Sequence, residues 1–107
     1  MLEATLSREI HASLVKNFMK ILILSQLDKA PMGGYDFIKF FYNKYNLLFS
    51  SGTIYSCLYS MERNGMVKGI QNKDKRIYKL TDKGRKALNT FRRGKEDLLK
   101  LVSDILR

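Results

Sequence analysis

Residues 66–80 have the pattern of a single β-hairpin in a chain whose other segments are typical of helices. Two short strand candidates, at about 66–70 and 76–80, flank the polar, turn-forming segment 72–75. An isolated two-stranded hairpin is only marginally stable in water. The hairpin must therefore pack against the neighbouring helices, and this requirement limits the folds that are open to the chain.

Two helical patterns begin the chain. The first runs to about Asp28, because the proline at position 31 disfavours helical geometry just before it. One side of this helix carries apolar residues at every fourth position, namely Leu2, Leu6, Ile10 and Leu14. The second pattern covers about 35–45 and follows a predicted turn at Gly33-Gly34.

A third helix is predicted over residues 51–64. Ser50 or Ser51 can cap its start, and Gly65 stands where helices commonly end in a left-handed residue. The positions predicted to face the core are Ile54, Leu58 and Met61. The opposite side carries small hydroxyl residues and one arginine, so it can approach a partner closely.

A last helix is predicted from Thr81, its cap, through residues 82–107. At 1.5 Å per residue it would be about 39 Å long, more than the preceding 80 residues can cover. Either a second copy of the chain buries its apolar side, or Gly84 or Gly94 bends it back onto its own domain. We favour the dimer. The predicted interface residues are Leu2, Leu6, Ile10, Leu88, Phe91, Leu98, Leu101, Val102, Ile105 and Leu106.

Three helices followed by a hairpin is the order of a winged helix-turn-helix domain. We therefore predict a mainly α fold with a small β-hairpin. Residues 1–81 would form the winged helix-turn-helix DNA-binding domain, and residues 82–107 would form a long C-terminal dimerisation helix. No repeat, low-complexity tract or linker divides the chain.

Positive charge is concentrated in the second half of the chain. Twenty Lys and Arg against ten Asp and Glu give a formal net charge of +10, and residues 68–95 hold eleven of these cations with two carboxylates. Such a segment favours nucleic acid first and an anionic membrane second, although many basic surfaces are merely solvated.

Double-stranded DNA is favoured over RNA. Readers of single-stranded RNA stack bases on exposed aromatic rings, whereas most aromatics here fall on apolar stripes.

Two surfaces are predicted to contact DNA. Hydroxyls on the third helix can bond phosphates or base edges, and Arg63 can bind guanine through two hydrogen bonds. Cations at the tip of the hairpin would neutralise phosphates. The predicted DNA-binding residues are Ser50, Ser51, Thr53, Tyr55, Ser56, Tyr59, Ser60, Arg63, Lys73, Lys75 and Arg76.

Other functions have less support. A single cysteine, Cys57, and a single histidine, His11, exclude a disulfide framework and a metal site built from several such ligands. We predict a protein that is not an enzyme and uses no cofactor, with Cys57 as a buried or half-buried spacer. A small-molecule effector is not indicated. The competing interpretation is a winged-helix module that binds another protein or a small molecule, without a specific DNA target.

A cytoplasmic protein without a membrane anchor is expected. The longest aliphatic run covers residues 21–24, whereas a membrane helix needs roughly 20 apolar residues. The first residues lack the positive start and apolar stretch of a secretory signal.

Over roughly residues 15–90 the chain resembles the PadR-like winged-helix transcription regulators. The matching segments include Gly34-Tyr35, Ser51-Gly52-Thr53-Ile54-Tyr55 and Tyr78-Lys79-Leu80-Thr81-Asp82-Lys83-Gly84, which are specific in combination. The resemblance implies a homodimeric DNA-binding repressor of the prokaryotic cytoplasm, bound to a near-palindromic operator. It implies DNA contacts by Ser51, Thr53, Tyr55, Lys75 and Arg76. Ser56 stands where the family usually has proline, and the single C-terminal helix is similar to that of short members.

Overall fold

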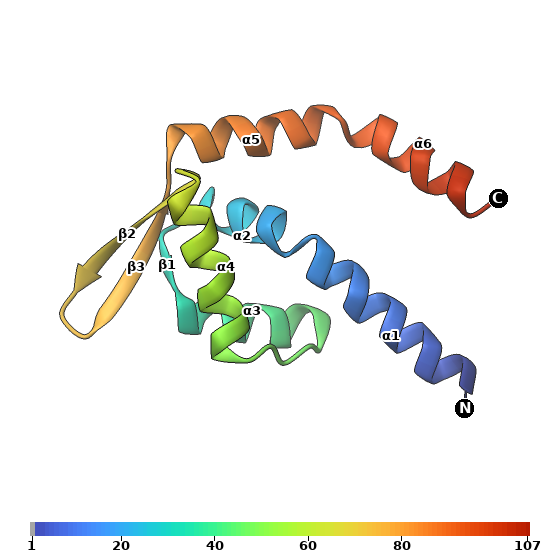
Figure 1. The fold of residues 1–107 in the computed structure, drawn as a ribbon, viewed down its shortest axis with the longest axis horizontal. Helices are drawn as coiled ribbons and strands as arrows, with labels where there is room; N and C mark the ends of the chain where they lie inside the picture. The colour runs from blue at the N-terminus through green and yellow to red at the C-terminus, as the bar shows by residue number, and fades with distance from the viewer. Residues whose placement is uncertain (1) are drawn as a thin grey trace.

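The computed structural model describes residues 2–107, which form six helices and a small antiparallel sheet whose hairpin projects from one end of the molecule (Figure 1). The helices are α1 (Leu2–Asn17), α2 (Met19–Leu27), α3 (Gly34–Tyr45), α4 (Ser51–Arg63), α5 (Asp82–Arg93) and α6 (Lys95–Ile105). The strands are β1 (Met32–Gly33), β2 (Val67–Asn72) and β3 (Lys75–Leu80), in the order β1-β3-β2. The predicted fold class, a mainly helical winged helix-turn-helix, is confirmed.

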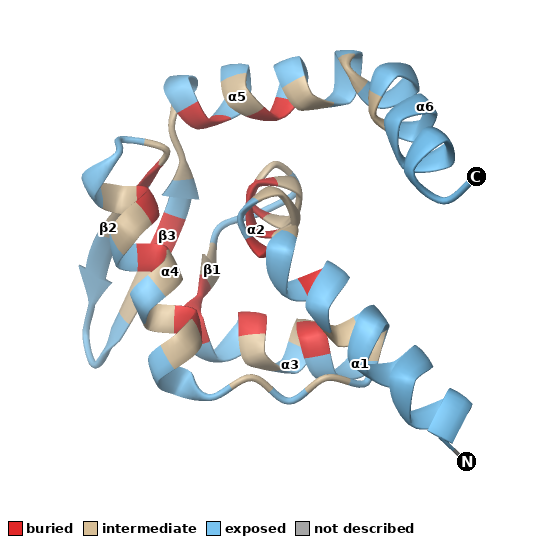
Figure 2. Ribbon diagram, turned by 45° about the vertical axis from the view of Figure 1, so that its right-hand side comes forward, coloured by how far each residue is buried: buried red, intermediate tan, exposed pale blue. Residues whose placement is uncertain are grey.

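The core lies between α2, α3, α4, α5 and the sheet, whose buried positions face one another in Figure 2. The three predicted core residues of α4, Ile54, Leu58 and Met61, are at most 2% exposed. Tyr78, at the centre of β3, is fully buried. The hairpin is therefore anchored at its base, as its marginal intrinsic stability requires.

Local signals fix both ends of α4. The Ser50 hydroxyl accepts a hydrogen bond from the Thr53 backbone N–H at 3.1 Å, so Ser50 is the cap. Gly65 takes a left-handed conformation with φ of 75°, and the N–H of Met66 then donates to the carbonyl of Met61 at 2.9 Å. Both the predicted start and the predicted end of this helix are confirmed.

The hairpin has a tighter turn than the sequence predicts. Asn72 pairs with Lys75, which leaves two residues in the turn, and Lys73 takes a left-handed conformation with φ of 56°. Both strands are consequently longer than predicted. Lys73 thus lies in the two-residue turn, whereas Lys75 begins β3.

Strand β1 and the start of α3 correct the predicted turn at Gly33-Gly34. Gly33 pairs with Ile77 in the sheet, and its N–H donates to the Asp36 carboxylate at 2.9 Å. Gly34 is the first residue of α3, where a Cβ atom would overlap the ring of Tyr55. A strand of two residues has no periodicity, so the sequence pattern does not predict it.

The first predicted helix is instead two helices that meet at Phe18. Backbone hydrogen bonds continue through the bend, since the Phe18 N–H donates to Leu14 and the Phe18 carbonyl accepts from Leu22. The Phe18 ring lies edge-on to Phe91 of α5, with 6.0 Å between the ring centres. The bend turns α1 away from the core while keeping this contact.

The predicted single C-terminal helix is wrong, because it breaks at Gly94 into α5 and α6. Arg92 and Arg93 end α5, whereas Glu96 and Asp97 begin α6. This charge order stabilises a helix end followed by a helix start, and glycine is a weak helix former. The break does not return α6 to its own domain, since none of its residues is buried and the helix extends outward (Figure 1).

Leu88 is the one residue of the predicted dimer interface that the structure places in the core. It is 1% exposed and belongs to the core of its own chain. It therefore has no surface to offer a second copy. Helix α5 is held against α2, where the Asp28 carboxylate accepts hydrogen bonds from Arg85 and Arg92.

Gly84 should be essential for joining α5 to the hairpin. A Cβ atom at this buried position would overlap the Met66 carbonyl, whereas a Cβ at Gly52 of α4 would meet only open space and the Ser50 hydroxyl. We expect Gly84→Ala to lower the free energy of unfolding by about 1–3 kcal/mol. Gly52→Ala should leave it unchanged or raise it by up to about 1 kcal/mol. Urea unfolding of both variants tests this, and equal effects would contradict the close packing at Gly84.

Candidate nucleic-acid interface

Helix α4 presents an uncovered side that lies opposite its buried residues. Ser56 and Arg63 are exposed and Tyr59 is 52% exposed. Thr53 and Arg63 are ten residues apart, which separates them by about 15 Å along the helix axis. This side is long enough to follow several base steps of a duplex.

The hydroxyls at the start of α4 are held in place before any partner binds. Ser50 and Thr53 share a side-chain hydrogen bond of 2.9 Å, in addition to the capping bond. Ser51 is exposed beside them. The cap thus fixes the direction of the helix start, which carries three of the predicted DNA-binding residues.

Tyr55 faces α3 and the hairpin instead of the centre of the uncovered side. Its half-buried ring lies over Gly34 and 6.2 Å from the ring of Tyr59. It borders a polar hollow, which we call the hairpin hollow. The other polar or charged side chains of its lining are Tyr35, Asp36, Lys39, Asp74, Lys75 and Arg76.

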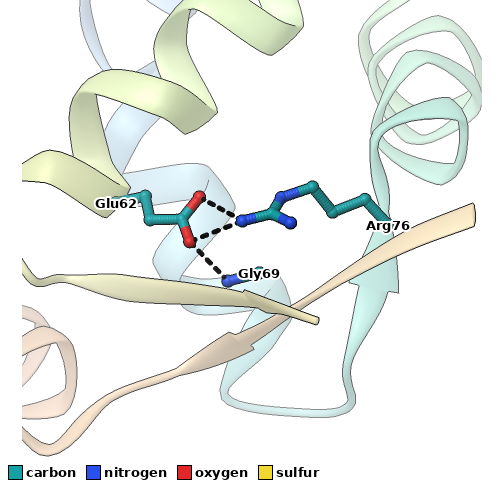
Figure 3. A network of polar contacts seen from close by, with 3 residues as sticks. All are labelled: Glu62, Gly69 and Arg76. Atoms are coloured by element: carbon teal, nitrogen blue, oxygen red, sulfur yellow. Dashed lines mark hydrogen bonds and ion pairs between the residues drawn. The ribbon is translucent and has the colours of Figure 1, made fainter. Parts of the chain in front are cut away.

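Arg76 is predicted from the sequence to contact phosphates at the tip of the hairpin, but in the structure it binds a carboxylate of its own chain. Its guanidinium donates to both oxygens of the Glu62 carboxylate, at 2.8 and 3.1 Å (Figure 3). The same carboxylate accepts the Gly69 N–H of β2 at 3.0 Å. A Cβ at Gly69 would overlap the guanidinium. The guanidinium is therefore bound within the chain instead of being presented at the tip.

These contacts shift the ionisation of both partners. The Gly69 N–H, and after it Arg76, hold the pKa of Glu62 below its usual range, while partial burial opposes them. The hydrogen bond that Arg76 donates to Glu62 raises the pKa of Arg76. The sequence analysis did not single out Glu62, because a lone glutamate on a helix gives no signal until the register of the hairpin is known.

The tip of the hairpin keeps its lysines available. Lys73 and Lys75 are exposed, and within residues 2–107 no carboxylate lies within ion-pair distance of either. Asp74 stands between them. Two of the three predicted tip cations are thus placed to meet an anion.

A second hollow lies on the other side of α4, against the junction of α1 and α2. We call it the lysine hollow. Its lining is formed by Lys16, Asn17, Met19, Lys20, Thr53, Ser56, Cys57 and Ser60. The sequence analysis did not single out Lys16 and Lys20, because it sought basic residues in the segment 68–95. Their four-residue spacing on a helical pattern was the available signal.

Cys57 is half-buried, as predicted, and its thiol lies 3.9 Å from the sulfur of Met61. Burial raises the pKa of this thiol, and the nearby ammonium of Lys20 opposes the shift. The thiolate is therefore disfavoured at this position. Residues 2–107 contain no group of three acidic, histidine or cysteine side chains that could hold a metal ion.

The arrangement defines a class of protein. A helix-turn-helix formed by α3 and α4, with a hairpin fixed beside the second helix, is a winged helix-turn-helix whose recognition helix is α4. No helix within residues 2–107 has both the length and the apolar character needed to cross a membrane.

The family follows from sequence comparison. The model of the transcriptional regulator PadR-like family matches residues 23–90, and the chain belongs to this family. It is therefore a transcriptional regulator and not an enzyme, as predicted. No curated protein matches the sequence closely.

Solved structures agree with this assignment. A PadR family transcription regulator from Clostridium difficile is 25% identical, with a TM-score of 0.73 over 84% of this chain and 99% of that one. A PadR family transcriptional regulator from Eggerthella lenta shares the fold at 21% identity, with a TM-score of 0.79 over 100% of this chain and 97% of that one. Bacillus subtilis PadR in complex with operator DNA is 28% identical, with a TM-score of 0.60 over 68% of this chain and 45% of that one.

The Glu62 carboxylate should make stability depend on pH. Its pKa in the folded chain lies below the ordinary value of 4.5, so the ionised group stabilises the fold above that pH. The contribution is lost as the pH falls through the folded-state pKa. We expect Glu62→Gln to unfold at lower urea than the natural chain at neutral pH, with the difference shrinking below about pH 4.5. Glu9→Gln, at an exposed position of α1, is the control. A difference between Glu62→Gln and the natural chain that does not change with pH would contradict the ionic contact.

Proposed function

We propose that this regulator is a sequence-specific double-stranded DNA-binding repressor that acts as a homodimer on a near-palindromic operator. The observation that carries the proposal is the uncovered side of α4, where hydroxyls and Arg63 lie beside a rigid hairpin with two available lysines. The operator complex of Bacillus subtilis PadR, 28% identical over the shared region, supports the choice of partner. A bound operator that overlaps the RNA polymerase site would give repression without a further surface on the protein. Such a regulator would act in the prokaryotic cytoplasm.

The proposed DNA contacts divide by position. Ser51, Thr53, Ser56 and Ser60 would approach base edges and phosphates, and Arg63 would bind guanine further along the groove. Tyr55 and Tyr59 can donate their hydroxyls to phosphate oxygens beside the hairpin, while Ser50 contributes chiefly as the cap. Arg76 supports the wing by fixing it to Glu62, and Lys73 and Lys75 carry its phosphate contacts.

The proposed pairing of two copies rests on α1 and α6, whose apolar sides are uncovered in the single chain. Helix α1 has one buried residue, Val15, and helix α6 has none. Exposed apolar side chains on the two helices are Leu2, Leu6, Ile10 and Leu14, then Leu99, Leu101, Val102, Ile105 and Leu106. Isolated helices of this length are marginal in water, so each needs a surface to pack against.

The two helices leave the domain on the same side, where both chain ends lie (Figure 1). Between α5 and α6, a largely apolar hollow is lined by Ala87, Thr90, Phe91, Gly94 and Leu98. We propose that a helix of the second copy occupies this hollow. In this arrangement residues 1–81 bind DNA and residues 82–107 supply the pairing, chiefly through α6 with half-buried Phe91 and Leu98 at its edge.

A charge on α6 should separate the two copies without unfolding either. Leu101 is 55% exposed in the single chain, so Leu101→Asp costs little there but places a carboxylate in the proposed interface. We expect sedimentation equilibrium to give a dimer for the natural chain and a monomer for Leu101→Asp, with cooperative unfolding of the winged-helix core retained when followed by circular dichroism. Leu48→Asp, at a 76% exposed position between α3 and α4, should remain dimeric. A monomeric natural chain would refute the pairing.

The wing lysines should set part of the salt dependence of DNA binding. Each phosphate neutralised adds about 0.9 to the slope of log affinity against log salt concentration. We expect Lys73→Ala with Lys75→Ala to flatten this slope by about 0.9 for each lysine that contacts a phosphate, measured by gel shift on mixed-sequence duplex DNA. An unchanged slope would remove the wing from the interface.

Selection from a random duplex pool tests specificity in the same system. Two α4 helices related by a two-fold axis should select a near-palindrome with half-sites about 34 Å apart. No binding at low salt would favour the alternative of a module for protein or small-molecule partners.

A further inference from the structure

The lysine hollow combines the side chains that commonly contact a nucleic-acid backbone. Two ammonium groups, one amide and three hydroxyls come from Lys16, Lys20, Asn17, Thr53, Ser56 and Ser60. Lysine, asparagine, serine and threonine donate to phosphate oxygens in protein–DNA contacts. The set is assembled from segments about 35 residues apart in the sequence, so only the fold brings it together.

The positive charges that line the lysine hollow have no acidic neighbours in the lining, unlike those of the hairpin hollow. Asp36 and Asp74 contribute to the lining of the hairpin hollow, next to Lys39 and Lys75. No carboxylate contributes to the lining of the lysine hollow. Within residues 2–107, neither Lys16 nor Lys20 has a carboxylate at ion-pair distance. An anion placed there would meet two lysines without a competing acidic group.

The lysine hollow lies along one flank of α4. Thr53, Ser56 and Ser60 lie on the flank of α4 that faces the α1–α2 junction, whereas Tyr55 lies on the flank that faces the hairpin. Figure 1 shows α4 between the hairpin on one side and α1 on the other. Lys20 and Cys57 contribute to the lining of the same hollow, so Lys20 lies beside α4.

We propose that the lysine hollow binds a phosphate of the duplex backbone, with Lys16 and Lys20 neutralising its charge and Asn17 with the α4 hydroxyls donating to its oxygens. This inference rests on the proposed DNA-binding function and extends it to a second flank. The backbone is then held on both sides of α4, by the wing on one side and by the α1–α2 junction on the other. The junction thereby joins a DNA contact directly to α1, the helix proposed to pair with a second copy.

The test compares two double variants that lose the same charge. Lys16→Ala with Lys20→Ala removes the proposed contact, whereas Lys29→Ala with Lys86→Ala removes two exposed lysines that contribute to neither hollow. Binding to a labelled mixed-sequence duplex is followed by fluorescence anisotropy over a salt series. We expect the first pair to flatten the log–log slope by about 0.9 in each bound chain, because each chain loses its contact with one phosphate. The second pair should change it clearly less, and Lys16→Arg with Lys20→Arg should retain the natural slope.

The outcomes separate this inference from the function on which it rests. Equal slopes for the two alanine pairs would overturn the phosphate site and leave only a general effect of net charge. A natural slope for the Lys16 and Lys20 pair, with a flattened slope for the Lys73 and Lys75 pair, would overturn the site while DNA binding stands. Failure of the natural chain to bind duplex at low salt would overturn both. Thermal unfolding by circular dichroism confirms that each variant is folded.

Discussion

The contact between Glu62 and Arg76 fixes the geometry on which DNA reading by this fold depends. Residue 62 lies in the last turn of α4, and residue 76 lies near the start of β3, so their ion pair joins the recognition helix to the wing. The Gly69 N–H makes β2 a third member of this network. A two-stranded hairpin alone would move relative to the helix. Because one carboxylate binds a group on each strand, this network joins the wing to the end of α4.

The contact between Glu62 and Arg76 also shows that two neighbouring basic residues of the wing have different environments. Arg76 and Lys75 are adjacent in the sequence and both are basic, yet the first is bound within the chain and the second is exposed. Arginine suits the inner position because its planar guanidinium donates to a carboxylate in a fixed geometry. Lysine suits the outer position because a flexible, hydrated ammonium can follow a phosphate. In the proposed DNA complex, the arginine therefore holds the wing against α4 and the lysines contact the phosphates.

Much of this fold could be predicted from local sequence signals. The Ser50 cap, the left-handed Gly65 and the Ile54, Leu58 and Met61 stripe depend on neighbours within one helix, so periodicity and capping preferences find them. The features that the sequence analysis missed depend on distant pairing. Strand β1 exists only because β3 lies beside it, and the lysine hollow exists only because the α1–α2 junction packs near α4. The break at Gly94 is an intermediate case. The basic residues before it and the acidic residues after it are visible in the sequence, but they indicate a break only when a helix is known to end and another to begin there.

The break at Gly94 and the bend at Phe18 have a common consequence for assembly. Each changes the direction of a terminal helix, while a ring contact or backbone hydrogen bonds hold the joint. Neither terminal helix can then bury its apolar side within its own chain. A straight C-terminal helix would have continued the line of α5, whereas the observed joint sets α6 apart from it (Figure 1). In the proposed homodimer, these joints set the angle at which the two copies meet and therefore the spacing of the two recognition helices along a duplex.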